Sequence, residues 1–132
     1  MNLIEGQGVA LYRGQRLLFE NLDLVLKTGE VLLVAGPNGC GKSSLLRLVA
    51  GLLRPAAGTL SGARVALAND DLALDRELPL SRALAFWTAG PLLEGAMTHF
   101  GLDQLSDVPV RLLSTGQARR ARLARVMASG AP

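Results

Sequence analysis

One stretch of sequence decides the fold of this chain: Gly36-Pro37-Asn38-Gly39-Cys40-Gly41-Lys42-Ser43. It matches the pattern G-x-x-x-x-G-K-[ST], in which the glycines let the backbone wrap closely around an anion and adopt positive φ angles. Successive backbone N–H groups and the positive end of a following helix can then bind phosphate groups. In such a loop Lys42 reaches the outer phosphates of a nucleotide and the Ser43 hydroxyl binds Mg²⁺. The stretch therefore predicts a nucleotide-binding loop.

The residues on either side of this loop support the prediction. Before it, the continuous apolar run Val31–Ala35 predicts a strand that is buried on both faces. After it, leucines at helical spacing predict a helix from Lys42 to Gly51, with Gly51 in the C-terminal cap region. A phosphate loop of this pattern requires a preceding strand and a following helix.

The rest of the chain predicts further strands and helices around this core. Alternation predicts a half-buried strand at Leu22–Leu26. Residues 55–62 are rich in turn formers, and Val65–Ala68 is expected to form a short strand. The remaining predicted elements are helices at Pro79–Ala89 and Pro91–Phe100, the second ended by Gly101, and a last helix that begins near Ser114. This order predicts an α/β core with a helical insert.

Length and composition exclude several classes of protein. The chain has 132 residues, of which 49% are hydrophobic and 19% charged, so we expect one folded domain and not a disordered chain. A single cysteine excludes an internal disulfide framework. The apolar runs are too short to span a bilayer, and Met1–Glu5 does not resemble a secretory signal. We therefore expect a soluble cytosolic domain.

The positive charge is concentrated near the C-terminal end. Residues 111–132 hold five arginines and no acidic residue, whereas the rest of the chain has a formal net charge of −2. None of the aromatic residues lies in this basic segment. Nucleic-acid binders usually combine spread basic residues with aromatics for stacking, so we expect no nucleic-acid partner.

A second motif, Leu113-Ser114-Thr115-Gly116-Gln117, precedes the arginine-rich segment. Its S-x-x-Q pattern is a capping box, which by itself predicts only a capped amphipathic helix. A helix N-terminus with a hydroxyl and a small glycine is also an anion site. Taken alone, the motif leaves both interpretations open.

Together the two motifs resemble the nucleotide-binding domain of ABC transporters, from Leu3 onward. The resemblance implies an α/β P-loop NTPase fold with an N-terminal antiparallel β-subdomain and a short helical insert. It places the β-subdomain and phosphate-loop core at 1–68, the insert at 69–113, and the signature motif with its helix at 114–132. We expect a partial domain with an incomplete core sheet.

The resemblance also implies cofactors, partners and site residues. ATP and Mg²⁺ are the expected cofactors. Two subunits are expected to form a head-to-tail homodimer that works with integral membrane subunits, peripherally at the cytoplasmic face of the bacterial inner membrane. The signature residues Ser114, Thr115, Gly116 and Gln117 would contact the ATP of the second subunit. The implied nucleotide-binding residues are Gly36, Pro37, Asn38, Gly39, Cys40, Gly41, Lys42, Ser43 and Ser44.

Shorter stretches resemble one group of this family, the ATP-binding subunits of haem exporters in cytochrome c maturation. They are Asp107–Arg111 directly before Leu112-Leu113-Ser114, Leu84–Trp87 and Leu18-Phe19. The implied function couples ATP to haem-related export. The alternatives are an ABC ATPase of another transporter, a nucleotide-binding remnant without turnover, and another P-loop NTPase whose second motif is a plain helix cap.

Two positions depart from the family pattern. Where the family has an aromatic residue to stack on adenine, this chain has Arg13, with Tyr12 one residue earlier, so both are stacking candidates. Where the family has a glutamine near the nucleotide, the chain has Asn69-Asp70-Asp71. Asp71 is the nearest equivalent and a candidate Mg²⁺ ligand, although its charge would lie beside the γ-phosphate.

The catalytic residues that the family uses for hydrolysis are not found in this sequence. No Asp or Glu follows Asp107, so the Walker B aspartate and the catalytic glutamate have no counterpart. His99 lies too early to be the family's switch histidine. We therefore expect ATP hydrolase activity of the family but none from this chain alone. We also expect Val31–Ala35 to be under-covered and the isolated chain to aggregate or unfold with poor cooperativity.

Overall fold

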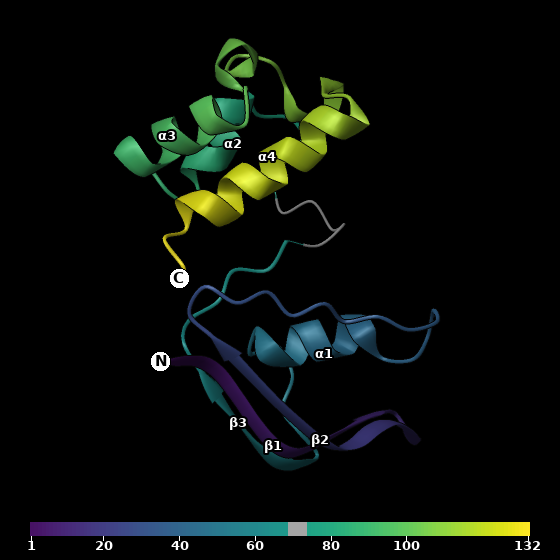
Figure 1. Ribbon diagram of the computed structural model, residues 1–132. Helices are drawn as coiled ribbons and strands as arrows, with labels where there is room; N and C mark the ends of the chain where they lie inside the picture. The colour runs from purple at the N-terminus through teal and green to yellow at the C-terminus, as the bar shows by residue number, and fades with distance from the viewer. Residues whose placement is uncertain (69–73) are drawn as a thin grey trace. The chain divides into compact units, whose positions relative to one another are not determined.

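The computed structural model describes residues 1–68 and 74–132 (Figure 1). They divide into two compact units, one formed by Met1–Leu67 with Pro132 and the other by Ala68–Ala131. Each unit is described by itself. Asp71 and its neighbours Asn69 and Asp70 lie outside the described residues, so the predicted Mg²⁺ ligand at Asp71 has no structural description.

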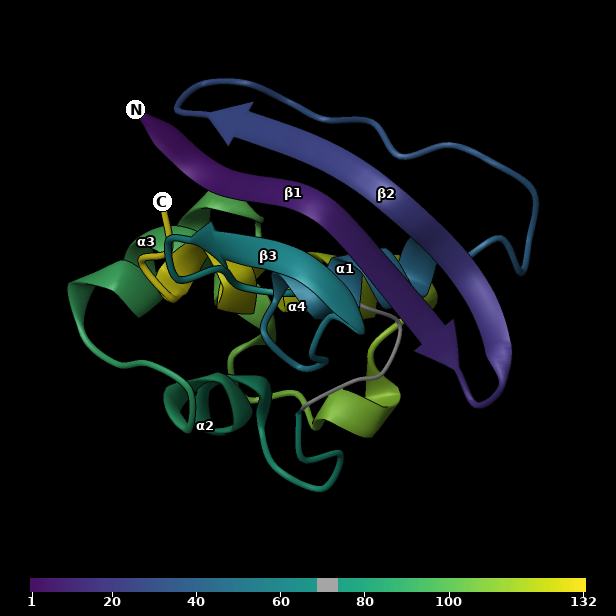
Figure 2. The ribbon, with the colours of Figure 1, turned by 90° about the horizontal axis from the view of Figure 1, so that it is seen from below.

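The first unit contains a three-stranded antiparallel sheet. Strands β1 (Asn2–Arg13) and β2 (Arg16–Lys27) form a hairpin in which Arg13 and Arg16 are cross-strand partners. The two-residue turn between them has Gly14 at a φ of 62°, the positive value that a tight hairpin turn needs. β3 (Ala57–Gly62) pairs with the other edge of β1, so the strand order is β2-β1-β3 (Figure 2).

The strand β3 corrects the prediction of a turn-rich segment at 55–62. Its sequence, Ala-Gly-Thr-Leu-Ser-Gly, contains residues that favour turns. The glycines are needed for a different reason, because a Cβ on Gly58 or Gly62 would collide with the backbone of β1. Glycine at these two positions therefore lets β3 approach β1 closely.

Helix α1 (Lys42–Val49) covers the sheet with one apolar face. Its buried Leu48 packs with Val9 and Leu11 of β1, and these residues form the core of the first unit. The helix ends in a Schellman motif: the Leu52 N–H donates to the Arg47 carbonyl at 2.9 Å, the Gly51 N–H donates to the Leu48 carbonyl at 3.0 Å, and Gly51 has a φ of 78°. The predicted helix and its glycine cap are confirmed.

Two predicted strands are wrong. Residues 30–37 and 63–68 contain no strand, so neither Val31–Ala35 nor Val65–Ala68 forms one. Val31 is 96% exposed and Leu33 is 85% exposed, which agrees with the expectation that this segment is under-covered in this chain. The physical reason is that a strand forms only when its backbone is hydrogen-bonded to a neighbouring strand. An apolar run favours such pairing but does not provide the neighbouring strand.

The second unit is helical, with α2 (Leu80–Ala85), α3 (Pro91–His99) and α4 (Thr115–Ala128). Two short 3₁₀ turns, η1 (Asp103–Leu105) and η2 (Val110–Leu112), connect α3 to α4. α3 and α4 lie side by side in Figure 1. The buried core contains leucines and methionine from the shorter helices and a stripe of alanines from α4: Leu80, Leu84, Leu93, Met97, Ala121, Ala124 and Ala128.

The helices of this unit agree with the sequence more closely than the strands of the first. α3 and α4 begin where Pro91 and Ser114 predicted. The helix predicted at Pro79–Ala89 is shorter, because α2 has Pro79 as its N-cap and ends at Ala85. Among the helices that the structure describes, none is long and apolar enough to cross a membrane.

Candidate functional site

The phosphate loop in the first unit has a backbone that only glycine adopts readily. Gly36, Gly39 and Gly41 have φ angles of 155°, 83° and 106°. A turn is closed inside the loop, where the Cys40 N–H donates to the Pro37 carbonyl at 3.3 Å. The glycines of the motif therefore adopt the positive φ angles that the sequence predicted.

The loop leads directly into the N-terminus of α1. Gly41 is the N-cap, no side chain caps the helix, and the first turn holds no acidic residue. The first N–H groups of a helix lack intrahelical partners, and they carry the positive end of the helix dipole. This end of α1 can therefore donate hydrogen bonds to an anion.

A cavity of about 200 Å³ lies over the loop and the start of α1. Its wall holds three cationic side chains, and none of the described residues that line it carries a carboxylate. The Lys42 ammonium donates to the Gly36 carbonyl, and the Arg16 guanidinium donates to the Gly39 carbonyl at 3.1 Å. The lining residues are Arg13, Arg16, Leu18, Asn38, Gly39, Gly41, Lys42, Ser43 and Ser44. This combination of cations, hydroxyls and free helix N–H groups fits a polyphosphate.

The structure brings most of the predicted loop residues together around this cavity. Asn38, Gly39, Gly41, Lys42, Ser43 and Ser44 line it. Gly36, Pro37 and Cys40 belong to the loop but not to the lining. The Cys40 sulfur lies against Gly36, where a Cβ would be 2.8 Å from it.

The two adenine-stacking candidates differ in position. Arg13 lines the cavity, whereas the half-exposed Tyr12 is not among its lining residues. This follows from strand geometry, because neighbouring side chains of β1 point to opposite faces. The sequence reasoning missed Arg16, which the hairpin places opposite Arg13. The signal was present in the sequence, since a two-residue turn between two arginines makes them cross-strand partners.

The signature motif forms the N-terminus of α4 in the second unit. Ser114 and Gln117 make the predicted capping box: the Gln117 N–H donates to Ser114 Oγ at 3.2 Å, and the Ser114 N–H donates to Gln117 Oε1 at 2.9 Å. Both side chains act as acceptors in these bonds. The Ser114 hydroxyl hydrogen and the Gln117 NH₂ group are not used by the box and remain donors. Capping and anion binding are therefore compatible at this motif.

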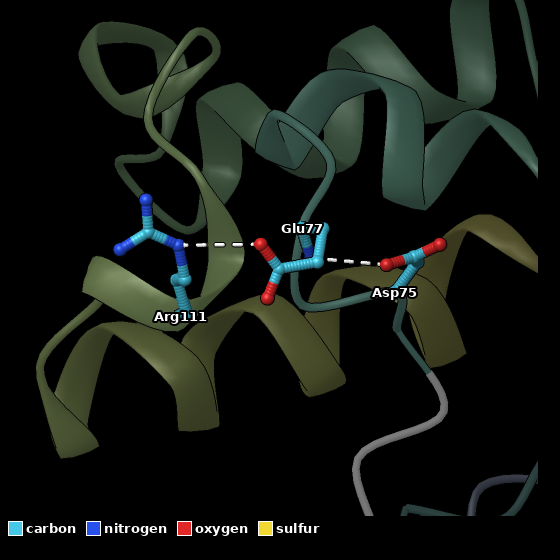
Figure 3. Close-up of polar contacts among 3 residues, drawn as sticks. All are labelled: Asp75, Glu77 and Arg111. Carbon is cyan, nitrogen blue, oxygen red and sulfur yellow. Dashed lines mark hydrogen bonds and ion pairs between the residues drawn. The ribbon is translucent and has the colours of Figure 1, made fainter.

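The segment before the signature motif is anchored to the segment before α2. The Arg111 Nε lies 3.5 Å from the Glu77 carboxylate, and the Glu77 N–H donates to Asp75 Oδ1 at 2.9 Å (Figure 3). The Arg111 N–H also donates to the Arg76 carbonyl at 3.0 Å. An exposed ion pair adds little stability by itself, so the backbone bonds carry most of this attachment.

Arginines of α4 also have structural partners within the second unit. Arg120 Nη1 donates to the Phe100 carbonyl at 3.0 Å, where it caps the end of α3. The Arg125 guanidinium lies 4.9 Å from the centre of the Trp87 ring. The positive charge of the C-terminal segment thus contributes to packing and capping.

The described part of the chain offers one candidate metal ligand at the phosphate loop and no cluster of acidic, histidine or cysteine side chains. Residues 1–68 and 74–132 contain no group of three or more His, Cys, Asp or Glu side chains that could hold a metal ion. At the phosphate loop the exposed Ser43 hydroxyl is an oxygen ligand of the kind that Mg²⁺ accepts. A magnesium ion there would take further ligands from bound phosphates and water.

The fold and the phosphate loop define a nucleotide-binding domain of the P-loop class. The sequence profile of the ABC transporter family matches residues 19–132, and the chain belongs to this family. The resemblance predicted from the two motifs is thereby confirmed.

The chain is also similar to curated relatives over most of its length. It is 55% identical to the cytochrome c biogenesis ATP-binding export protein CcmA of Sphingopyxis alaskensis, with 98% of this chain and 70% of the relative covered. It is 56% identical to the CcmA of Novosphingobium aromaticivorans, with 94% and 65% covered. For the CcmA of Zymomonas mobilis the identity is 53%, with 93% and 58% covered. The chain thus spans 58–70% of the length of these three relatives.

Solved structures confirm the fold class. An ATP-binding subunit of an ABC transporter matches with a TM-score of 0.82 at 20% identity, covering 94% of this chain and 61% of that one. CbiO1 of Clostridium perfringens, part of the ABC transporter complex cbiONQ, matches with a TM-score of 0.79 at 20% identity, covering 97% and 62%. These likenesses establish the α/β fold of an ABC ATPase domain with its antiparallel β-subdomain.

Proposed function

We propose that this chain is the ATP-binding subunit of an ABC transporter that couples ATP binding and hydrolysis to haem-related export in c-type cytochrome biogenesis. One observation supports nucleotide binding above all, the cavity over the phosphate loop with Arg13, Arg16 and Lys42 in its wall. Support for the cargo comes from relatives that are named cytochrome c biogenesis export proteins. ATP supplies a polyphosphate that these cations and the start of α1 can bind.

Each loop residue has a defined task in this proposal. Lys42 leaves the Gly36 carbonyl and binds the outer phosphates, and Ser43 binds the Mg²⁺ that accompanies the nucleotide. The Arg13 guanidinium stacks on the base, because its planar group can replace an aromatic ring. Asp71 is proposed as a second oxygen ligand of Mg²⁺ on the sequence alone.

The signature motif is proposed to act on the nucleotide of a second copy. Ser114, Thr115 and Gly116 are exposed at the start of α4, where the helix dipole favours an anion. The Ser114 hydroxyl and the Gln117 amide would donate to the γ-phosphate held by the partner. ATP would thus join two copies head to tail, in contact with integral membrane subunits on the cytoplasmic side of the inner membrane.

A second candidate function is nucleotide binding without turnover. It is favoured by the cavity over the phosphate loop, where none of the described lining residues carries a carboxylate that could orient an attacking water. We expect this chain alone to bind ATP and to release no phosphate. Phosphate release at a rate above that of a Lys42→Met variant would exclude this second function.

Binding of ATP to the purified chain tests the nucleotide part of the proposal. Calorimetry should detect binding that Lys42→Met weakens by a factor of about 30 or more, because the variant removes a charge-assisted bond. Arg54→Met serves as the matched control, since Arg54 is exposed and does not line the cavity. Equal affinities of the wild type and Lys42→Met would contradict the proposed site.

The cargo part is tested in the organism that encodes the chain. Deletion of its gene should abolish haem-stained c-type cytochromes while the apocytochromes are still synthesised. Restoration by the wild-type gene but not by the Lys42→Met gene would tie the defect to the phosphate loop. Normal haem staining in the deletion strain would rule out this cargo and leave another transporter as the alternative.

A further inference from the structure

Arg16 joins the β-hairpin to the phosphate loop. It is the first residue of β2, directly after the turn at Gly14 and Gln15, and its position is set by pairing with Arg13. Its Nη2 donates to the Gly39 carbonyl at 3.1 Å, across 23 residues of sequence. The bond therefore connects a hydrogen-bonded sheet to a loop of irregular backbone.

The bond acts on a peptide that is also held from its other side. The Gly39 carbonyl accepts from Arg16, and the Cys40 N–H donates to the Pro37 carbonyl at 3.3 Å. A trans peptide is planar, with its C=O and N–H pointing in opposite directions. Two bonds at opposite ends therefore fix the orientation of the Gly39–Cys40 peptide.

This orientation matters because Gly39 lines the cavity. The oxygen of a carbonyl carries partial negative charge and repels phosphate when it faces a bound anion. A guanidinium bonded to this carbonyl offsets that charge and adds a positive charge to the cavity wall. Glycines on either side give the loop many alternative conformations, so a constraint at its centre lowers the entropy lost on binding.

We propose that Arg16 is a positioning residue of the nucleotide site, which holds the Gly39–Cys40 peptide in the conformation that receives the polyphosphate. This inference rests on the proposed function, because it assigns a new residue to the same site. Lys42 contacts phosphate directly, whereas Arg16 acts through the loop. Arg16 should therefore contribute equally to the binding of ATP and of ADP, because both nucleotides place phosphates in the loop.

The test compares Arg16→Met and Arg16→Lys with the control Arg54→Met. Binding of ATP and of ADP is measured by calorimetry. The rate at which iodoacetamide alkylates Cys40 is measured without nucleotide, and it reports on the loop directly because the chain has one cysteine. Circular dichroism verifies that each variant is folded, and Arg16→Gln replaces Arg16→Met if the latter is not.

We expect Arg16→Met to weaken ATP and ADP by the same factor of about ten, the size of one charge-assisted hydrogen bond. Alkylation of Cys40 should become at least about threefold faster, because the peptide loses one of its two restraints. Arg16→Lys, which keeps a cationic donor, should recover most of both effects. Arg54→Met should behave as the wild type.

Three results would overturn the inference. Unchanged alkylation of Cys40 in the variants would show that the bond does not restrain the loop. Unchanged affinity in Arg16→Met would show that the restraint is irrelevant to binding. A much larger loss for ATP than for ADP would make Arg16 a direct γ-phosphate ligand. If the wild type binds no ATP, the proposed function fails, and the alkylation rates still decide whether Arg16 positions the loop.

Discussion

At the scale of single residues, the side chain of Cys40, at a variable position of the phosphate loop, limits the space at Gly36, a fixed position of the motif. Gly36 has a φ of 155°, and a Cβ there would lie 2.8 Å from the Cys40 sulfur. Both the backbone angle and the neighbouring thiol therefore disfavour a larger residue at Gly36. The thiol fills space inside the loop, although Cys40 is not part of the cavity lining.

A bulky maleimide attached to Cys40 should lower the affinity for ATP by at least about tenfold, because the adduct must displace Gly36 from its close contact with the sulfur. The measurement is calorimetric titration with ATP before and after complete labelling. Cys40→Ser treated with the same reagent is the matched control and should keep its affinity. Full labelling with unchanged affinity would show that the loop tolerates the adduct.

At the scale of elements, the two helix N-termini are built in opposite ways. α1 starts at Gly41 without a side-chain cap, whereas α4 starts at Ser114 with a complete capping box. An uncapped start leaves its N–H donors for a ligand, and a capped start stabilises the helix in the absence of one. Local stability and ligand binding can therefore be separated by mutation at Ser114.

Ser114→Asp should separate the cap from the proposed contact with ATP. Aspartate accepts the Gln117 N–H as serine does, so the thermal stability of α4 should be kept. The aspartate carboxylate has no hydrogen to donate, and its negative charge repels the γ-phosphate. ATP-dependent dimerisation should therefore be lost. Sedimentation velocity with and without ATP measures the fraction of dimer. The experiment uses protein for which ATP binding has been verified.

Ser114→Ala is the companion variant. It removes both the helix cap and the proposed hydrogen bond to the γ-phosphate. It should therefore lower the stability of α4 by about 1 kcal/mol and also abolish ATP-dependent dimerisation. If Ser114→Asp dimerises with ATP as the wild type does, the motif is a plain helix cap. The alternative of another P-loop NTPase would then be favoured.

The elements also show what the sequence can predict and what it cannot. α1, α3 and α4 were predictable because their caps and apolar spacing are local signals, as at Ser114 and Gly101. Val31–Ala35 was predicted as a strand from its own composition, but pairing depends on a distant partner. β3 was missed for the converse reason, since Gly58 and Gly62 are required by the neighbouring strand β1.

The residues of the candidate site also differ in whether local sequence signals could predict them. The phosphate loop and the capping box are contiguous in sequence, so their residues could be named before the fold was known. Arg16 contributes through a bond to a residue 23 positions away, and no local pattern indicates that bond. Arg13 and Tyr12 were separable only once the face of β1 toward the cavity was established.

The exposed segment Val31–Ala35 should make the isolated chain self-associate, because an apolar run with unpaired backbone groups is a template for pairing. The double variant Val31→Lys, Leu33→Lys should reduce light scattering of the chain while its circular dichroism stays unchanged. Leu52→Lys is the matched control, since Leu52 is also exposed but lies outside the run. Equal scattering by the double variant and the wild type would place the association elsewhere.

At the scale of the whole molecule, the two compact units have separate cores. One core centres on Val9, Leu11 and Leu48, and the other combines leucines of α2 and α3 with the alanines of α4. The phosphate loop belongs to the first unit and the signature motif to the second. A ligand of the loop should therefore stabilise one unit more than the other.

Thermal unfolding of the chain should accordingly depend on the probe. Trp87, the single tryptophan, reports on the second unit, and alkylation of the single cysteine, Cys40, reports on the first. ATP at about 100 times its dissociation constant adds about 2.7 kcal/mol to the unit that binds it. For a unit of this size the midpoint seen through Cys40 should rise by roughly 10–20 °C, with little change in the midpoint seen through Trp87.

Lys42→Met supplies the control for this experiment, because it removes the proposed phosphate ligand and should abolish the ATP-dependent shift. Addition of AMP should also produce little shift, since a monophosphate offers fewer charged oxygens to Lys42 and the N–H groups of the loop than a triphosphate does. A single sharp transition that both probes follow, moved equally by ATP, would contradict independent units. It would show that binding at the phosphate loop is transmitted to α4 and its signature motif within one cooperative domain.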